Sequence, residues 1–472
     1  MSVQSSEETD LLVVGAGPGG YVAAIRAAQR GVDVRLVDRD GVGGTCLNHG
    51  CIPSKAMITA TNRVDDVLGF EEMGIYAEPF VDVGEMVDWK RGVVERLTGG
   101  VRELCEANGV ELRTGTATFI DEHTATIESD GVAGEVVFEN AIIATGSRPI
   151  ELPGFGFDDD PILDSRQALA LEHAPSELVV IGAGYIGMEL STVFAKLGSA
   201  VTVVEALDAV LPAYEASLAE PVRERATEIG IDFELDEQAV EWRRSTDGIV
   251  VVSEDENGDR SEYPCEQALV AVGREPVSET LGLDALGIES DENGFVSTDD
   301  RCRTALNHVY AVGDVAGEPL LAHKASHEGT VAAEAIAGGS GSVADRAVPA
   351  VVFTDPEIGT VGSTAADAEA DGFEPLVGTF PLRASGRALT LGETDGFVQI
   401  VADEATERIL GGQCVGPEAS ELVAEIGLAI ELDATLDDLT GTIHAHPTLS
   451  EAVMEAAENA LGQAIHTPNR DR

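Results

Sequence analysis

Basic residues are scarce in this chain, and lysine is almost absent. The 472 residues contain 29 Lys and Arg against 85 Asp and Glu, which gives a formal net charge of −56. Only four of the basic residues are lysines, so 29 − 4 = 25 are arginines. A surface of this sign repels nucleic acid and anionic membranes, and we expect neither as a partner.

The acidic residues are not gathered in a tail but are spread along the whole chain between apolar segments. This distribution favours a folded protein from a high-salt cytoplasm over a disordered acidic one. Near 1 M salt the Debye length is only about 3 Å, so repulsion between the carboxylates is screened.

A disulfide framework, a signal peptide and a membrane span are lacking as well. Six cysteines in 472 residues are too few for a small secreted scaffold. The N-terminus has no basic segment followed by an apolar core, and no apolar run approaches 18 residues. We therefore expect a cytoplasmic protein of two to four domains. Four isolated cysteines are expected to be buried and inert: Cys105, Cys265, Cys302 and Cys414.

A glycine-rich turn between an apolar run and a helical segment occurs twice. The glycines are Gly15, Gly17 and Gly20 in the first copy and Gly182, Gly184 and Gly187 in the second. Such glycines let the backbone approach a pyrophosphate at a positive helix N-terminus. Asp38 and Glu205 end the second predicted strand of each copy, where a carboxylate binds ribose hydroxyls. One such turn is a weak signal, but two in matching context predict two nucleotide-binding domains.

Both copies also close on a similar motif, at 141–149 and at 268–276. From first to closing glycine the copies span 146 − 15 = 131 and 273 − 182 = 91 residues. The extra residues of the first copy include a segment with two cysteines. A third apolar run, at 308–314, predicts a further strand. The predicted fold class is α/β, with two Rossmann-like domains and a C-terminal α+β domain.

The cysteine segment Gly43–Lys55 reads GGTCLNHGCIPSK. Five residues of regular helix rise about 7.5 Å, whereas a disulfide needs Cα atoms within roughly 7 Å. Cys46 and Cys51 can therefore pair only across a distorted turn, which Gly50 permits. Pro53 suits the first turn of a following helix, whose N-terminus favours a thiolate. In an intracellular protein such a disulfide is catalytic rather than structural.

The alternative for this segment is a metal site formed by Cys46, His49 and Cys51. It lacks the usual Cys-x-x-Cys spacing and an evident fourth ligand. We therefore predict no metal.

The segment Gly43–Lys55 resembles the active-site signature of the class I pyridine nucleotide–disulfide oxidoreductases, most closely those that oxidise dihydrolipoamide. The resemblance covers essentially the whole chain. It includes both glycine turns, Gly313–Asp314, Leu321–Ala325, and His446–Pro447 followed by Glu451. It implies a homodimer that uses FAD and NAD. It also implies an FAD-binding domain (1–149), an NAD-binding domain (150–276), a central domain (277–345) and an interface domain (346–472).

The resemblance assigns cofactor contacts residue by residue. Those implied for FAD are Gly15, Gly17, Gly20, Asp38, Gly44, Thr45, Lys55, Ala117, Gly146, Asp314 and Ala322. Those implied for NAD are Gly182, Gly184, Gly187, Glu205 and Gly273. Lys55 is implied to pair with Glu189 beside the flavin.

The resemblance also implies the catalytic groups. Cys46 meets the substrate, Cys51 faces the flavin, and His446 of one subunit acts as base toward the disulfide of the other. Glu451 fixes the tautomer of that histidine. A histidine that titrates near neutrality suits the removal of a thiol proton. The residues alone leave plainer roles open: Thr448–Glu451 fits a capping box, and His446 fits an ordinary interface histidine.

The coenzyme and substrate are implied with alternatives. Glu205 has no arginine after it until Arg223, and a carboxylate there repels the 2′-phosphate of NADP, so NAD is favoured. The implied reaction oxidises protein-bound dihydrolipoamide on a lipoyl domain of a 2-oxo acid dehydrogenase or glycine-cleavage complex. A related NAD(P)H-dependent disulfide reductase and a mainly structural flavoprotein subunit are the alternatives. The roles of His49 and Tyr185 are left open.

Overall fold

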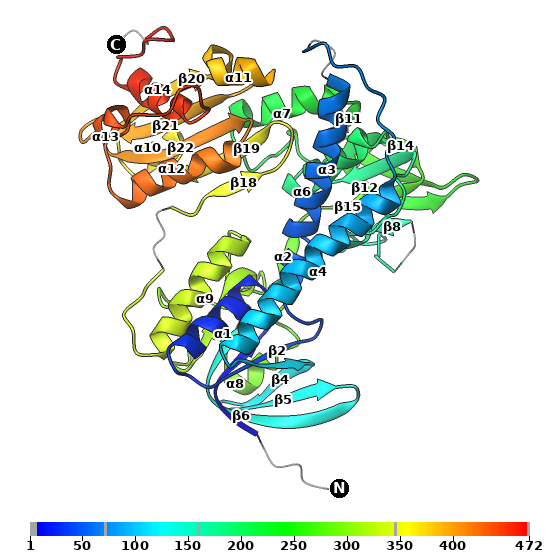
Figure 1. The fold of residues 1–472 in the computed structure, drawn as a ribbon. Coiled ribbons are helices and arrows are strands. Elements are labelled where there is room, and N and C mark those ends of the chain that lie inside the picture. Colours follow the sequence, from blue (N-terminus) through cyan, green and yellow to red (C-terminus); the bar gives the residue numbers. More distant parts are fainter. Residues whose placement is uncertain (1–6, 70–72, 159–160, 344–346, 470–472) are drawn as a thin grey trace.

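The computed structural model describes residues 7–69, 73–158, 161–343 and 347–469. Figure 1 shows three lobes: an N-terminal lobe at the bottom, a second α/β lobe at the right, and a C-terminal lobe at the upper left. The long helices α3 (Cys51–Gly69) and α4 (Val83–Ala107) extend from the first lobe toward the second.

The N-terminal lobe contains the first predicted strand–turn–helix–strand unit. Its sheet has the order β3–β2–β1–β6–β5–β4, with β17 beside β6. The strands are β1 (Glu7–Val14), β2 (Val34–Asp38), β3 (Glu111–Thr114), β4 (Thr116–Asp121), β5 (Thr124–Ser129), β6 (Val132–Ile143) and β17 (Val309–Ala311). The apolar strand β1 lies between β2 and β6, parallel to both.

Two elements from farther along the chain complete this lobe. β17 pairs with β6 in parallel, with Val309 opposite Ala141. The helix α9 (Ala322–Ile336) packs along α1 (Pro18–Gln29), and the two lie side by side in Figure 1. The sequence predicts a strand over 308–314, but the strand ends at Ala311 and a 3₁₀ turn, η2 (Gly313–Val315), follows. Gly313 adopts a φ of +75°, which ends the extended backbone.

The second lobe repeats the design. Its parallel sheet has the order β11–β10–β9–β15–β8. The strands are β8 (Ile162–Leu163), β9 (Glu177–Ile181), β10 (Ala200–Val204), β11 (Ile231–Glu234) and β15 (Gln267–Val270). An antiparallel sheet adds β12 (Glu237–Arg244), β13 (Ile249–Asp255) and β14 (Arg260–Cys265). The helices are α5 (Ser165–Ala168), α6 (Tyr185–Lys196) and α7 (Ala216–Glu228).

The two closing motifs of the repeat pair with each other. β7 (Ser147–Pro149) runs antiparallel to β16 (Arg274–Pro276), with Arg148 opposite Glu275. The side chains of this pair form an ion pair at 2.7 Å. The repeat seen in the sequence therefore also joins the two lobes.

The C-terminal lobe is the predicted α+β unit. Its sheet has the order β18–β19–β22–β21–β20, with antiparallel neighbours. The strands are β18 (Ala350–Val352), β19 (Glu357–Gly362), β20 (Pro375–Pro381), β21 (Phe397–Asp403) and β22 (Ile409–Gly416). The helices include α10 (Ala365–Ala370), α11 (Gly386–Leu391), α12 (Ala419–Glu431), α13 (Leu436–Gly441) and α14 (Glu451–Ala460).

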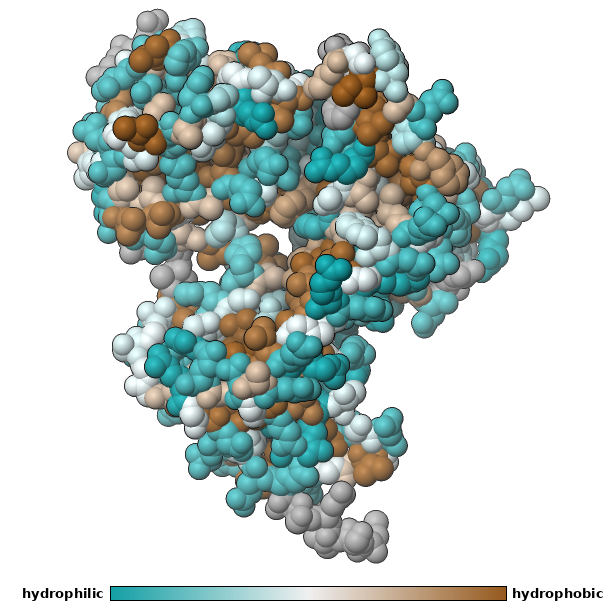
Figure 2. Space-filling view, viewed as in Figure 1, coloured by the Kyte–Doolittle hydropathy of each residue, from teal (hydrophilic) through white to brown (hydrophobic). Residues whose placement is uncertain are grey.

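The distribution of side chains between surface and interior agrees with the composition. Hydrophilic side chains predominate on the face shown in Figure 2, with apolar side chains scattered between them. All four isolated cysteines are buried thiols, as predicted. The lysines also lie inside: the exposed fraction is 28% for the Lys55 side chain, 12% for Lys324 and 2% for Lys196, and Lys90 is buried. Within the described residues no helix is long and apolar enough to cross a membrane.

Candidate active site

A cavity of about 450 Å³ lies where the first two lobes meet. The first glycine turn, the end of β2, the helix α2 (Gly44–Asn48) and the start of α3 form much of its wall. Tyr185 and Glu189 enter it from α6 of the second lobe, and Asp314 enters it from η2. Residues from both nucleotide-binding units therefore line one cavity.

Asp38 and Glu205 make the same hydrogen bonds in the two units. One oxygen of each accepts from a main-chain N–H inside the glycine turn, that of Ala16 or Ala183, at 2.7 Å. The other oxygen accepts from the N–H two residues farther on, at 2.8 and 2.9 Å. Burial raises the pKa of Asp38. The repeated geometry singles out these two carboxylates in a chain where acidic residues are abundant.

The last glycine of each turn lets the helix approach the turn closely. A Cβ on Gly20 would lie 1.8 Å from the Gly15 carbonyl oxygen, and a Cβ on Gly187 would lie 2.0 Å from that of Gly182. Any side chain at either position would push helix and turn apart. These glycines serve packing, and neither lines the cavity.

The predicted distorted turn separates the two cysteines. α2 ends at Asn48 and α3 begins at Cys51, with Pro53 buried in the first turn of α3. A Cβ on Gly50 would lie 3.1 Å from the carbonyl oxygen of Thr45, so this turn favours glycine. Both predictions for the segment, the broken helix and the proline in the first turn, are confirmed.

Cys46 and Cys51 are in contact as thiols. The Cys46 thiol donates a hydrogen bond to the Cys51 sulfur, which raises the pKa of Cys46 and lowers the pKa of Cys51 to about 7. Burial opposes the lowering at Cys51, and the charge of Lys55 adds to it. Cys51 is therefore the sulfur that carries negative charge near neutral pH.

Lys55 and Glu189 form the predicted ion pair across the two lobes. Lys55 Nζ lies 2.8 and 3.0 Å from the two carboxylate oxygens of Glu189. The Glu189 side chain is only 4% exposed, so its charge requires this partner. Phe353 of the C-terminal lobe adds two contacts, because its N–H donates to Glu189 Oε1 at 2.9 Å and its ring centroid lies 4.5 Å from Lys55 Nζ.

A hydrogen-bond chain holds Asp314 at the cavity wall. Ser147 Oγ donates to Asp314 Oδ2 at 2.5 Å and accepts from Arg274 Nε at 2.8 Å. From the other side, Glu328 accepts from the N–H of Gly313 at 2.7 Å. The neighbour of Asp314 in the chain is thus fixed by α9.

His446 and Glu451 form a pair, but they lie outside the cavity. His446 Nδ1 is 2.9 Å from Glu451 Oε1, and the histidine side chain is 79% exposed. Neither residue lines the cavity, and Figure 1 shows α13 and α14, which flank this segment, in the lobe away from α2. The predicted capping box is half formed: Glu451 Oε2 accepts from the N–H of Thr448 at 2.9 Å, but the Thr448 hydroxyl donates to Ala445 and the helix starts at Glu451.

The structure brings most of the predicted FAD residues and both cysteines to the cavity. The predicted residues that line it are Gly15, Gly17, Asp38, Gly44, Thr45, Cys46, Cys51, Lys55, Ala117, Gly146, Glu189, Asp314 and Ala322. The predicted residues that do not line it are Gly20, Gly182, Gly184, Gly187, Glu205, Gly273, His446 and Glu451.

Comparison with known proteins identifies the family of the chain. Residues 9–329 match the sequence model described as pyridine nucleotide-disulphide oxidoreductase, and residues 348–457 match the dimerisation domain of the same family. The chain belongs to the pyridine nucleotide-disulphide oxidoreductase family.

Relatives within this family match over nearly their whole length. The chain is 62% identical to a dihydrolipoyl dehydrogenase of Halobacterium salinarum, over 98% of this chain and 99% of the relative. It is 47% identical to a dihydrolipoyl dehydrogenase of Geobacillus stearothermophilus, over 97% of each. Among solved structures, LpdA of Mycobacterium tuberculosis is 30% identical with a TM-score of 0.90, covering 95% of this chain and 99% of that one. The flavoprotein disulfide reductase RclA of Escherichia coli is 25% identical with a TM-score of 0.85, over 95% and 99%.

The family uses FAD and NAD, and the cavity fits the flavin nucleotide. Its wall runs from Asp38, at the end of β2, past the glycine turn to the cysteines. Glycine at 44 lets α2 lie directly against the first glycine turn, because a Cβ there would lie 2.5 Å from the Cα of Gly17. Lys55, Asp314 and main-chain groups supply the polar contacts that a phosphate-bearing cofactor needs. Tyr185, at the N-terminus of α6, brings the second lobe to the same cavity, although the glycines of the second turn do not line it.

The structure also bears on the residues left open. His49 lines the cavity, and burial, followed by the charge of Arg166, lowers its pKa, so it is neutral at neutral pH and a charged role beside the thiolate is disfavoured. Burial raises the pKa of Tyr185 to about 12. Within the described residues, no group of three or more His, Cys, Asp or Glu is arranged to hold a metal ion.

Sequence reasoning missed several groups that shape the site. Ser147 and Arg274 stand inside the repeated closing motifs, so that repetition was the available signal. Phe353 and Lys196 gave no signal, because their partners stand on other elements, more than 100 residues away in the sequence.

Proposed function

We propose that this chain is a dihydrolipoyl dehydrogenase that oxidises protein-bound dihydrolipoamide to lipoamide and reduces NAD to NADH. The observation that carries the proposal is the contact between the Cys46 and Cys51 thiols in the wall of a cavity that extends to Asp38. A dithiol beside a nucleotide cavity can exchange electrons with a dithiol substrate on one side and with a cofactor on the other.

FAD, when bound, supplies two-electron transfer between the dithiol and NAD. The first glycine turn and Asp38 would hold its adenosine end, and Asp314 would hold its ribityl chain. Lys55, which is paired with Glu189 and acts on the charge of Cys51, would stand beside the ring. Gly44, Thr45, Ala117, Gly146 and Ala322 provide further contacts from the cavity wall.

The second glycine turn would hold NAD. Gly182, Gly184 and Gly187 form this turn, and Glu205 at the end of β10 would bind the ribose hydroxyls. Gly273 closes the site. Support comes from the identical hydrogen bonding of Glu205 and Asp38, since both carboxylates are fixed against their turns.

The exchange step starts from the oxidised pair. A thiolate of the substrate attacks Cys46 Sγ, the Cys46–Cys51 bond breaks, and Cys51 leaves as the thiolate. The second substrate thiolate then attacks the substrate sulfur bound to Cys46, which forms lipoamide and releases Cys46. The lowered pKa of Cys51 makes it the better leaving thiol.

The base for this step comes from a second copy of the chain. His446 removes protons from the substrate thiols, and Glu451 holds its Nδ1 so that Nε2 is the accepting atom. Because the pair lies outside the cavity of its own chain, we place it against the cysteines of the other subunit of a homodimer. The matched dimerisation domain supports this arrangement. We divide the chain at 149, 276 and 345 into the FAD-binding, NAD-binding, central and interface domains.

The electron donor is a lipoyl group carried by a partner protein, the lipoyl domain of a 2-oxo acid dehydrogenase or glycine-cleavage complex. The test uses the purified protein with dihydrolipoamide, a lipoylated domain and glutathione, each with NAD or NADP. We expect NADH formation with dihydrolipoamide and with the reduced lipoyl domain. Cys51→Ser should retain FAD and lose turnover by about 10³-fold or more. Turnover with glutathione and NADP alone would refute the proposal.

A further inference from the structure

The helices α3 and α6, which carry Lys55 and Glu189, are joined by a second ion pair farther along their length. α3 carries Lys55 and Asp65, and α6 carries Glu189 and Lys196. Lys55 pairs with Glu189 at 2.8 Å, and Lys196 pairs with Asp65 at 3.3 Å, so the signs are exchanged between the two contacts. Because residues seven apart share a helix face, Glu189 and Lys196 both point from α6 toward α3.

One segment of the C-terminal lobe contacts both of these ion pairs between α3 and α6. It comprises residues 353–356 and joins β18 to β19. At the cavity end, Phe353 donates its N–H to Glu189 and places its ring beside Lys55. At the far end, Asp355 lies among cations.

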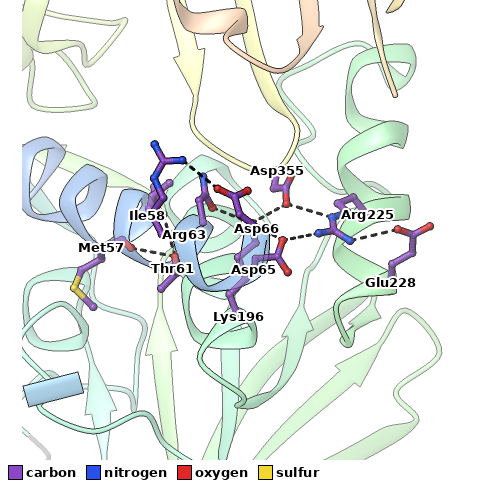
Figure 3. Close-up of polar contacts among 11 residues, drawn as sticks. Met57, Ile58, Thr61, Arg63, Asp65, Asp66, Lys196, Arg225, Glu228 and Asp355 are labelled. Carbon is purple, nitrogen blue, oxygen red and sulfur yellow. Dashed lines mark hydrogen bonds and ion pairs between the residues drawn. The ribbon is translucent and has the colours of Figure 1, made fainter. Parts of the chain in front are cut away.

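The contacts of Asp355 are shown in Figure 3. Its Oδ2 accepts from Lys196 Nζ at 2.7 Å and from Arg225 Nε of α7 at 3.2 Å. Asp65 shares the same two cations, at 3.3 Å from Lys196 and 2.6 Å from Arg225. The segment is thus tied to α6 and α7 of the second lobe.

Because Lys196 is buried, the charges of this cluster depend on one another. The Lys196 side chain is 2% exposed, and a buried ammonium requires carboxylate partners. Burial alone would raise the pKa of Asp355, but Lys196 and Arg225 hold it below its usual value. Asp355 therefore stays charged at neutral pH and keeps its ion pairs with both cations.

We propose that Asp355 is a positioning residue for the redox centre. Its ion pairs with Lys196 and Arg225 anchor the 353–356 segment, so that Phe353 holds the Glu189–Lys55 pair beside Cys51. The proposal deepens the proposed function, and it rests on that function in placing Cys51 beside the flavin.

The consequence concerns the charge on Cys51. The charge of Lys55 favours the Cys51 thiolate. Cys46 and Glu189 also act on the Cys51 sulfur, and Tyr185 interacts with it electrostatically. When the segment is released, Glu189 loses the Phe353 N–H and gains water, and Lys55 loses both its fixed partner and the ring. The cation then spends less time near the sulfur, and the thiolate is less favoured.

The chain offers a matched control in Asp65. It contacts the same two cations, and its side chain is 27% exposed against 28% for Asp355. It stands on α3 and does not hold the segment. A merely structural cluster would respond equally to the loss of either carboxylate.

The experiment uses FAD-containing protein with the Cys46→Ser substitution, alone and combined with Asp355→Ala or Asp65→Ala. A thiolate beside oxidised flavin produces a long-wavelength absorbance band, and its titration with pH gives the midpoint for Cys51. We expect Asp355→Ala to raise the midpoint by about 0.5 unit or more, and Asp65→Ala to leave it within about 0.1 unit. Asp355→Asn, which keeps the shape, should give an intermediate rise and serves if the alanine variant does not retain FAD.

Equal midpoints in all variants, or equal rises for both alanine variants, would overturn the positioning role. Absence of the band in the Cys46→Ser parent would instead refute the placement of Cys51 beside the flavin, and with it both proposals.

Discussion

His446 Nδ1 lies 2.9 Å from Glu451 Oε1, and neither residue reaches the cavity of its own chain. The carboxylate fixes one edge of the imidazole and leaves the opposite edge exposed to a partner. Under the proposed function, this pair can act as a base only if a second chain brings its cysteines to it.

This arrangement predicts that two inactive chains restore each other. Cys51→Ser and His446→Gln homodimers should each lose about 10²-fold or more of their turnover. A heterodimer of the two, isolated by different tags on the chains, holds one native site and one doubly altered site. It should recover about half of the native turnover of dihydrolipoamide with NAD. A heterodimer as inactive as its parents would place the complete site within one chain.

The hydrogen bond from Cys46 predicts a pH dependence for the reduced protein. The pKa of Cys51 is lowered from 9.0 to about 7, so its thiolate persists above pH 7 and is lost as the pH falls through that value. The ultraviolet thiolate absorbance of the reduced protein, minus that of Cys51→Ser, should titrate with a midpoint near 7. A midpoint near 9 would mean that Cys46 and Lys55 do not act on this sulfur.

The coenzyme preference should depend on Glu205. We expect Glu205→Ala to raise the KM for NAD about 10-fold with little change in kcat, because a ground-state contact and a brace of the turn are lost together. Discrimination against NADP should fall, since the repelling charge is gone. Asp232→Asn, an exposed carboxylate on the neighbouring strand β11, is the charge control and should leave both KM values unchanged.

Salt should stabilise the fold. With a net charge of −56, self-repulsion opposes the compact state in dilute buffer, and molar salt screens it. We expect the melting temperature to rise by about 10 °C or more between dilute buffer and about 2 M KCl, with activity rising in parallel. Equal melting temperatures in both would remove the halophilic interpretation of the acidity.

The parts predicted best from the sequence are those whose physics is local. The glycine turns, Gly50 and Pro53 each act on backbone within a few residues, and the structure confirms the elements they predict. The Lys55–Glu189 pair was reached only through the family resemblance, because no local pattern links positions 134 residues apart.

The parts that escaped prediction depend on packing between distant elements. The strand predicted over 308–314 ends early because Gly313 turns toward α9, which begins nine residues later in the chain. The contacts of Asp355 with α6 and α7 arise only after three lobes have assembled. An acidic residue in so acidic a chain carries no signal of its own.

The inward placement of all four lysines has a practical consequence for chemical modification. Reagents that acylate or cross-link lysine amines meet no strongly exposed lysine, so they should capture the dimer poorly even when it is abundant. Lys55 has the most accessible of the three ion-paired lysine side chains, and it lines the cavity. Acylation of Lys55 should therefore be slow, and a nucleotide bound in the cavity should slow it further.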